Sequence, residues 1–342
     1  MDRIMLAHGG GGKAMEDLIK NIFLKSMGNE ILNGMEDAAA LNIEDVVPSL
    51  PDSGDCRLAF TTDSFIVKPA FFPGGDIGRL SVCGTVNDLL CRGALPLYMS
   101  ASFIIEEGFE IKKLEKIAGS MAKTSREAGI KLVAGDTKVA EKGSVDGIFI
   151  NTSGIGVIPP DINISIKNAR PGDAVIISGT IGNHGMAVLS AREGLEFESP
   201  LKSDVAPLVE MVQNIISIKG AVKVLRDPTR GGVAEVLNEI ASRSGVGIEV
   251  WEEKLPVDPA VLSACDMLGF DFLHLANEGK IIAVVAHEKA KDVLEAIKKS
   301  RYGEKAEIIG RVNNSGLVTL KTRFGTFRII DRPFGELLPR IC

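Results

Sequence analysis

Short apolar runs and amphipathic segments alternate along most of the chain. Apolar runs bounded by glycine, proline or polar residues are typical of β-strands. These runs lie at 58–62, 131–134, 147–151, 174–178, 272–275, 280–286 and 317–320. Apolar residues that recur every three or four positions predict helices at 111–121 and 233–240, and a third helix is expected over 288–300. Strands mixed with helices in both halves of the chain predict an α+β protein.

A turn-rich passage separates the two halves of the chain. It runs over 158–172 and contains Pro159, Pro160 and Pro171, and residues of this kind connect structural units. With 342 residues, the chain is long enough for two domains of ordinary size. We therefore predict an N-terminal domain over 1–158 and a C-terminal α/β domain over 170–322. The pattern fades after that point, so a flexible tail is expected over 323–342.

Composition and charge narrow the class of protein. Hydrophobic residues make up 45% of the chain and charged residues 25%, as in globular proteins. A net charge of −6 without a basic stripe argues against a nucleic-acid partner. The sequence has no signal-peptide pattern and no apolar stretch of membrane-spanning length, which argues against a membrane protein. Its 5 cysteines form no CxxC pair, which favours reduced thiols, and we expect a cytoplasmic protein.

Four aspartates occur in segments rich in small residues, which let a phosphate chain approach the backbone closely. Magnesium prefers oxygen ligands and commonly bridges carboxylates to phosphates. Asp63 follows an apolar run and Asp88 interrupts an apolar helical stretch, and an unpaired charge is costly at such positions. A magnesium–phosphate site is one interpretation of the set, and helix caps or turns are the other. The four residues are Asp37, Asp63, Asp88 and Asp227.

Two glycine-bearing segments are candidate phosphate cradles. The first, residues 8–13, precedes a predicted helix whose N-terminus attracts anions, although its spacing does not match a Walker A motif. We expect it to close over a nucleotide as a mobile lid, the alternative being an unstructured N-terminal arm. The second, residues 134–138, follows an apolar run and directs polar side chains into a cleft, unless it forms a plain β-turn.

The final residue of the sequence is Cys342, which offers a nucleophilic thiolate at the end of the predicted tail. A thiol in this position can be loaded with a chemical group and presented to another site. Two other interpretations stay open: the residue has no role, or a partner's backbone amides bind its carboxylate. Prenylation is excluded because that motif places its cysteine four residues from the end.

Further motifs extend over nearly the whole chain. They lie at 8–12, 62–64, 71–78, 84–88, 135–139, 227–232, 276–280 and 339–342. Taken together, they resemble the HypE family of [NiFe]-hydrogenase maturation proteins, which are carbamoyl dehydratases. That family belongs to the PurM-like superfamily of aminoimidazole ribonucleotide synthetase and selenophosphate synthetase. The aspartate motifs are shared by the superfamily, whereas the run FFPGGDIG at 71–78 and the final PRIC are specific to the family.

The resemblance implies a fold, two cofactors and a set of site residues. The implied fold has two PurM-like domains, with a β-barrel shared between the N-terminal domains of a homodimer, and ATP bound near the domain cleft. The implied Mg²⁺ ligands are Asp37, Asp63, Asp88 and Asp227. The implied ATP-binding residues are His8, Gly9, Gly10, Gly11, Gly12, Lys13, Asp63, Asn87, Gly135, Asp136 and Thr137. The residues implied in the chemistry are Lys138, Glu278 and the modified Cys342.

The implied reaction is the ATP-dependent dehydration of an S-carbamoyl group on Cys342 to S-cyanide, a thiocyanate that supplies the cyanide ligands of hydrogenase iron. The implied partners are the carbamoyltransferase HypF, which loads Cys342, the HypC–HypD iron scaffold, which accepts cyanide, and a second copy of the chain. Alternatives are a small-molecule kinase or synthetase of the same superfamily and a non-catalytic thiol carrier. The chain departs from the family pattern at Gly10, where serine is expected, and at Asn183, where an aspartate is expected before His184.

Overall fold

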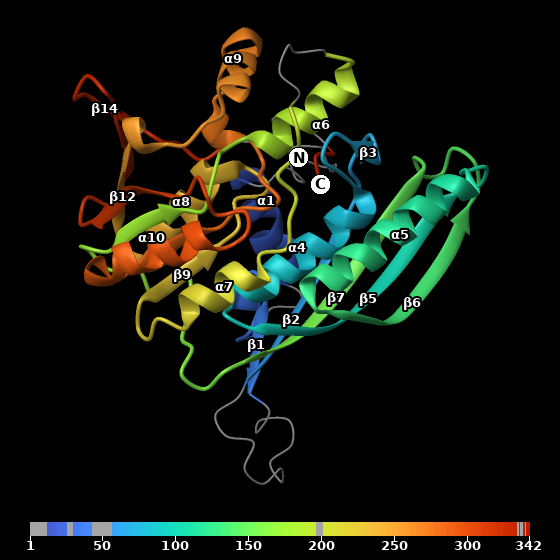
Figure 1. The fold of residues 1–342 in the computed structure, drawn as a ribbon, viewed down its shortest axis with the longest axis horizontal. Helices are drawn as coiled ribbons and strands as arrows, with labels where there is room; N and C mark the ends of the chain where they lie inside the picture. Colours follow the sequence, from blue (N-terminus) through green and yellow to red (C-terminus); the bar gives the residue numbers. More distant parts are fainter. Residues whose placement is uncertain are drawn as a thin grey trace, which may run out of the picture.

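The computed structural model describes residues 12–25, 30–42, 57–195, 201–333, 335, 338 and 340–342. They form two domains, each built on a β-sheet with helices packed against it. The N-terminal sheet and its helices lie on one side of the molecule, and the C-terminal sheet and its helices lie on the other (Figure 1).

The N-terminal domain contains a five-stranded sheet in the order β1-β2-β7-β5-β6. Its strands are β1 Ala39–Asn42, β2 Arg57–Phe65, β5 Leu95–Glu106, β6 Lys131–Ala140 and β7 Ile148–Ile158. Neighbouring strands are antiparallel except for β5 and β6, which are parallel. Buried and more exposed residues alternate along β7, as expected for a sheet that is covered on one face only.

Helices α4 Ile77–Cys91 and α5 Ile111–Ala128 cover that face of the sheet (Figure 1). Helix α4 is buried almost all round because the sheet lies on one side of it and the C-terminal domain on the other. Helix α5 is amphipathic and buries Ile117 and Met121, as the sequence pattern predicts, whereas Ile111 at its first position is exposed. Shorter elements of this domain are α1 Gly12–Leu18, η2 Ile19–Leu24, η3 Leu32–Gly34, β3 Phe71–Phe72 and β4 Gly75–Asp76.

The C-terminal domain contains a seven-stranded sheet in the order β14-β13-β10-β12-β8-β11-β9. Its strands are β8 Ala174–Ile177, β9 Val222–Arg226, β10 Gly247–Trp251, β11 Ile282–Val285, β12 Glu307–Asn313, β13 Val318–Lys321 and β14 Phe327–Ile329. Its helices are α6 Asn183–Glu193, α7 Val209–Ile216, α8 Gly232–Ser244, α9 Pro259–Leu268 and α10 Ala290–Lys299, with short 3₁₀ turns η4 Glu252–Lys254, η5 Phe272–His274 and η6 His287–Lys289. No helix in the described part of the chain is long and apolar enough to span a membrane.

Two segments of the C-terminal half differ from the secondary structure that the sequence predicts. The apolar run 272–275 forms the 3₁₀ turn η5, because Asp271 accepts a hydrogen bond from the backbone of Leu273 and starts the turn. Leu273 and Leu275 are buried nonetheless, so the run is apolar because it packs in the core. Residues 327–329 were expected in the tail but form β14, which pairs with β13 at the sheet edge.

A continuous core joins the two domains. One cluster of buried apolar side chains contains Leu80 of α4 together with Leu208 and Met211 of the C-terminal domain. Within this seam the buried amide of Asn87 accepts a hydrogen bond from Leu208 N at 3.1 Å and donates one to Ala206 O at 3.1 Å. The side chain therefore links α4 to the backbone that precedes α7, and this contact helps to fix the relative position of the domains.

We expect the substitution Asn87→Ala to lower the free energy of unfolding by about 2 kcal/mol, because it leaves two buried backbone groups without partners. Thermal unfolding followed by calorimetry measures this loss. Asn168→Ala is a matched control, since Asn168 makes one hydrogen bond to the Asn163 carbonyl at the surface and should change stability by about 0.5 kcal/mol or less. Equal unfolding of the two variants would contradict a structural role for Asn87.

Candidate active site

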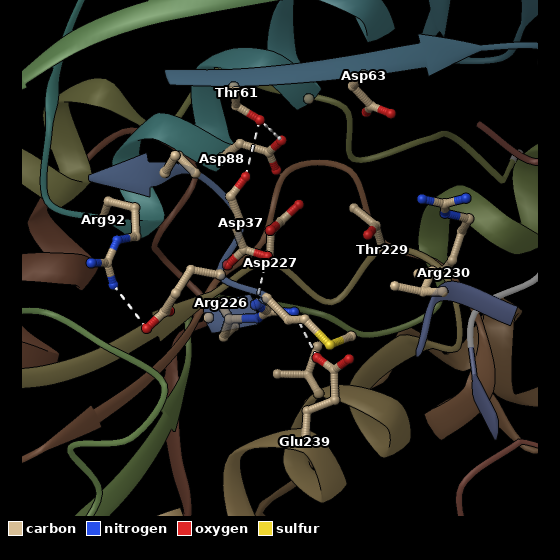
Figure 2. Close-up of a pocket in the computed structure, with 18 of the residues that line it drawn as sticks. Asp37, Thr61, Asp63, Asp88, Arg92, Arg226, Asp227, Thr229, Arg230 and Glu239 are labelled. Carbon is tan, nitrogen blue, oxygen red and sulfur yellow. Dashed lines mark hydrogen bonds and ion pairs between the residues drawn. The ribbon is translucent and has the colours of Figure 1, made fainter. Parts of the chain in front are cut away.

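A cavity of about 730 Å³ lies where the two domains meet. Its wall is formed by α1, β1, β2 and α4 on the N-terminal side, and by the loop after β9 and helix α8 on the C-terminal side. Figure 2 shows the polar side chains of both domains pointing toward a common centre. The cavity exists only because the two domains pack in this orientation, so neither domain contains the site alone.

Nine carboxyl side chains line this cavity, and the four predicted aspartates and Glu278 are among them. Asp63 lies on β2, where alternate residues Thr61 and Phe65 are buried against α4. Asp88 lies on α4 and is 2.9 Å from the Thr61 hydroxyl. The predicted members are Asp37, Asp63, Asp88, Asp227 and Glu278, and the others are Glu16, Glu36, Glu235 and Glu239.

Burial of the predicted carboxyl groups raises their pKa values, and their mutual repulsion adds to the effect. The pKa of Asp63 rises to about 6. Those of Asp37, Asp88 and Glu278 rise well above their usual range, and Asp227 contributes repulsion to all three. Buried charges of one sign are stabilised by a bound cation. The site therefore favours either protonation of these groups or binding of a positive ion.

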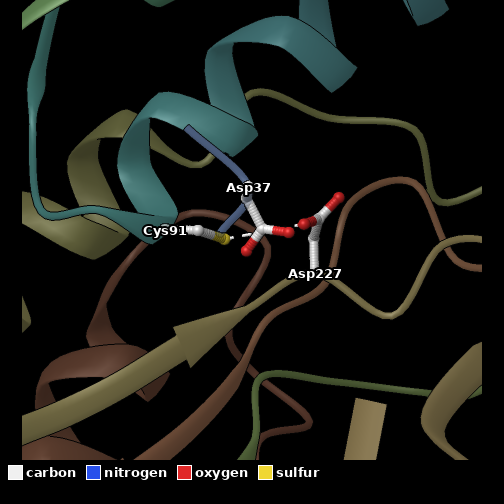
Figure 3. Close-up of side chains that lie close together, drawn as sticks. All are labelled: Asp37, Cys91 and Asp227. Atoms are coloured by element: carbon white, nitrogen blue, oxygen red, sulfur yellow. Dashed lines mark hydrogen bonds between the residues drawn. The ribbon is translucent and has the colours of Figure 1, made fainter. Parts of the chain in front are cut away.

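The donor groups fit a magnesium ion. Glu278 Oε1 is buried and has no hydrogen-bond partner in the described structure, so it is available to accept a proton or to coordinate a metal. Asp37, Cys91 and Asp227 offer donor atoms that all lie within 4.8 Å of one another (Figure 3). Burial raises the pKa of the Cys91 thiol, which keeps that sulfur protonated and leaves the carboxylates as the hard ligands that Mg²⁺ prefers.

Two arginines of the same loop region add positive charge to the cavity. Arg226 Nη1 lies 2.8 Å from Asp37 Oδ1, and its Nη2 lies 2.6 Å from Glu239. Arg230 also faces the cavity (Figure 2). The negative charge at Cys342 is the largest cause of a raised pKa for Arg230. Guanidinium groups bind phosphate oxygens well, so Arg230 is a candidate contact for the transferred phosphate.

The end of the chain is docked against the N-terminal domain, and Cys342 lines the cavity. The docked segment pairs with the residues that follow β2: Ile66 N donates to Cys342 O at 3.0 Å, and Lys68 N donates to Arg340 O at 3.1 Å. Ile341, between these two residues, is only 5% exposed. The sequence predicts a flexible tail, but in this structure its last residues are held by backbone hydrogen bonds.

Several predicted nucleotide-binding residues lie elsewhere. Residues 135–138 belong to the edge strand β6 and not to a turn, and their side chains are exposed. Asp63 lies opposite Thr152, Thr152 opposite Ala101, and Ala101 opposite Gly135. Three strand spacings, about 14 Å, therefore separate β6 from Asp63.

The remaining predicted positions lie in different places. Lys138 pairs with Asp136 at 2.9 Å on the exposed edge strand. Asn87 lies in the domain seam, where its hydrogen bonds go to backbone groups. Gly12 lines the cavity and Lys13 is exposed beside it. His8, Gly9, Gly10 and Gly11 lie outside the described residues.

Sequence reasoning missed several residues of the cavity. Arg230 belongs to the motif at 227–232, so its position close to Asp227 in the sequence could have identified it as a site residue. Arg226 directly precedes that motif. No local pattern identifies Thr61 or Glu239, because each reaches the site through a strand or helix that is ordinary in sequence. Their roles follow from packing.

Comparison with known proteins assigns a family to both domains. Residues 35–158 match the model of the AIR synthase related protein N-terminal domain, and residues 170–323 match that of the C-terminal domain. The carbamoyl dehydratase HypE of Rhizobium leguminosarum bv. viciae is 50% identical, over 99% of this chain and 95% of that protein.

Solved structures give the same result. The chain is similar to one in a crystal structure of a HypE–HypF complex, with 59% identity, a TM-score of 0.86, and coverage of 92% of this chain and 99% of that chain. A crystal structure of HypE in complex with ATP shows 44% identity and a TM-score of 0.81, over 99% of this chain and 100% of that chain. The matches thus extend across both domains and the cavity between them.

We expect added MgCl₂ to raise the unfolding temperature, because a ligand at one hundred times its Kd stabilises the folded state by about 2.7 kcal/mol. Asp63→Asn or Asp88→Asn should remove most of that increment, since each removes a negative ligand. Without magnesium, both variants should be at least as stable as the parent because repulsion is relieved. Asp266→Asn, on exposed α9, is the control. A full magnesium increment in both site variants would show that these residues are not ligands.

Proposed function

The chain belongs to the HypE family of carbamoyl dehydratases, and from this membership we propose that it dehydrates an S-carbamoyl group on its own Cys342 to S-cyanide, with ATP as the driving substrate. The product supplies the cyanide ligands of [NiFe]-hydrogenase iron. One observation carries the proposal: Cys342 lines the same cavity as the four aspartates and Glu278. Thiol and phosphate chemistry would then share one enclosed space between the domains.

The amide oxygen of the carbamoyl group cannot leave as hydroxide. Transfer of the γ-phosphoryl group of ATP to that oxygen converts it into a phosphate leaving group. Loss of two protons from nitrogen and departure of phosphate then leave a carbon–nitrogen triple bond on sulfur, with ADP and phosphate as the other products. The reaction therefore needs positioning of the phosphates, neutralisation of their charge and a base.

We assign these tasks to the cavity residues. Asp37, Asp63, Asp88 and Asp227 would hold Mg²⁺, which when bound neutralises phosphate charge. Arg230 would contact the transferred phosphate. Glu278 is the preferred base, because it is buried in the cavity with one carboxyl oxygen unpaired. The segment 8–13 stays a proposed lid over the nucleotide.

A second copy of the chain would cover the exposed face of the N-terminal sheet. The face of the five-stranded sheet opposite α4 and α5 carries apolar residues that are about half exposed: Phe60, Tyr98, Ile104 and Ile155. Exposed apolar patches of this kind mark association surfaces. We propose that two such faces close into the shared barrel of a homodimer. Lys138 pairs across from Ile104 on this sheet, so it would act in the chemistry of the partner subunit's site and not its own.

The proposed partners follow the family. A HypE–HypF complex is known for a relative that is 59% identical to this chain, and we propose that a HypF-type carbamoyltransferase loads Cys342. A HypC–HypD iron scaffold would accept the cyanide, and the reactions would take place in the cytoplasm. The tail must leave the cavity for loading and delivery and return for dehydration.

Intact-mass spectrometry of the carbamoylated protein tests the reaction directly. We expect the modified chain to lose the mass of one water only when Mg-ATP is present. Cys342→Ser should accept no carbamoyl group and show no loss, because its oxygen is a weaker nucleophile than the thiolate. Cys265→Ser, at a buried thiol on α9, should behave like the parent. ATP hydrolysis without any mass loss on the carbamoylated chain would contradict the proposal.

Mixing variants tests which chain supplies each group. Lys138→Ala should lose dehydration, and mixing it with Cys342→Ser should restore part of it, because the second chain lends its lysine across the dimer interface. Glu278→Gln should lower the rate about a hundredfold or more and should not be rescued by the same mixture, because Glu278 lines the cavity of its own chain. Single-turnover assays measure both mixtures. If the mixture of Lys138→Ala and Cys342→Ser shows no dehydration, Lys138 does not act in the partner subunit's site.

A further inference from the structure

A fully buried histidine holds the docked end of the chain. His184 lies in the first turn of α6, and Gly182 before it has a positive φ of 83° that lets the chain turn into the helix. The imidazole Nε2 is 2.7 Å from Ile341 O, and Nδ1 is 2.7 Å from Ser203 Oγ. The ring also packs edge-on against Phe72 at a centroid distance of 5.4 Å.

The hydrogen bonds of His184 determine where its proton lies. A backbone carbonyl accepts only, so Nε2 carries the hydrogen that is donated to Ile341 O. Nδ1 then accepts from the Ser203 hydroxyl, and Ser203 Oγ in turn accepts from Val205 N at 3.1 Å. Burial lowers the pKa of His184, which agrees with a neutral ring. One tautomer is thus fixed, and it presents a donor to the tail.

The backbone pairing of the tail leaves its register open. Ile66 and Lys68 bond to alternate residues, Cys342 and Arg340, and a ladder of this kind can re-form after a slip of two residues. Such a slip would move the thiol by about 6.6 Å. Arg192 Nη2, 2.7 Å from Arg340 O, comes from a long, half-buried side chain that can follow the shifted carbonyl. The contact to Ile341 O comes from a rigid, buried ring.

We propose that His184 is a positioning residue which fixes the register of the docked tail, so that the Cys342 sulfur faces the carboxylates of the cavity. The inference rests on the proposed function and adds a residue to which that function assigns no role. Ile341 supports the same register, because its side chain is buried in the core shared by both domains. His184 acts on the tail and touches none of the reacting atoms.

Two substitutions separate the hydrogen bond from packing. His184→Leu removes the donor, whereas His184→Gln places an amide N–H near the position of Nε2. The assay is alkylation of Cys342 by iodoacetamide in the absence of ATP. We expect the rate to be about tenfold higher in the leucine variant, because loss of one buried hydrogen bond has an effect of this size. The glutamine variant should react at close to the parent rate. The single-turnover rate of dehydration of the carbamoylated chain should be lower in His184→Leu and close to the parent rate in His184→Gln.

His287→Gln, at an exposed position in η6, is the control and should match the parent in both assays. A parent-like alkylation rate in His184→Leu overturns the proposal, whatever its turnover. Equal acceleration in the leucine and glutamine variants also overturns it, because packing alone would then account for the effect. Because alkylation needs neither ATP nor a loading partner, failure of the proposed reaction would leave this result interpretable.

A spectroscopic measurement covers the case in which His184→Leu does not fold. In ¹⁵N-histidine-labelled protein, removal of Ile341 and Cys342 should shift the Nε2 resonance of His184, because its acceptor is lost. The signal is assigned by its disappearance in His184→Gln. An unchanged resonance after truncation would show that the ring does not hold the tail, and would overturn the proposal.

Discussion

Buried negative charge at the seam between two domains is the constraint on which the rest of this structure depends. Carboxyl groups from β2, α4, the loop after β9 and the segment that precedes β11 converge on one cavity, and burial raises their pKa values. Arg226 is already shared between Asp37 and Glu239. The repulsion within such a cluster destabilises the folded protein, and a bound cation with a nucleotide would relieve it. The apolar packing of α4 between the sheets holds these groups together despite their repulsion.

The division of the site between domains has a physical consequence. Asp63 and Asp88 belong to the N-terminal domain, and Asp227 and Glu278 belong to the C-terminal domain. Small changes in the angle between the domains would therefore change every distance in the proposed metal site. Asn87 opposes such changes, because its amide links α4 to the backbone before α7 through bonds that are shielded from water.

In the proposed reaction, the tail makes substrate and enzyme one molecule. Its backbone pairs with the residues that follow β2, and its last residue, Cys342, lines the cavity. This arrangement replaces a bimolecular encounter by a local docking step, so the accuracy of docking decides whether the sulfur meets the phosphates. Backbone pairing sets the direction in which the tail runs, and the buried contacts of Ile341 set its position along that direction. Docking must also be weak enough to reverse, which suits a segment held by a few hydrogen bonds.

The sequence by itself determined the α+β class and the family, and it singled out four aspartates, Glu278 and Cys342, all of which line the cavity, because these depend on local periodicity and on motifs that carry their chemistry in residue type. It misassigned 272–275 as a strand, since burial makes a run apolar without deciding its backbone, and it placed β14 in the tail, since an edge strand with exposed side chains has no clear pattern. Only the tertiary structure decided that Lys138 lies on the edge strand β6, three strand spacings, about 14 Å, from the strand that carries Asp63. It also placed the Asn87 amide at the contact between the two domains. Arg226, Glu239 and His184 acquire their roles through contacts between residues distant in the chain, and such contacts leave no local signal.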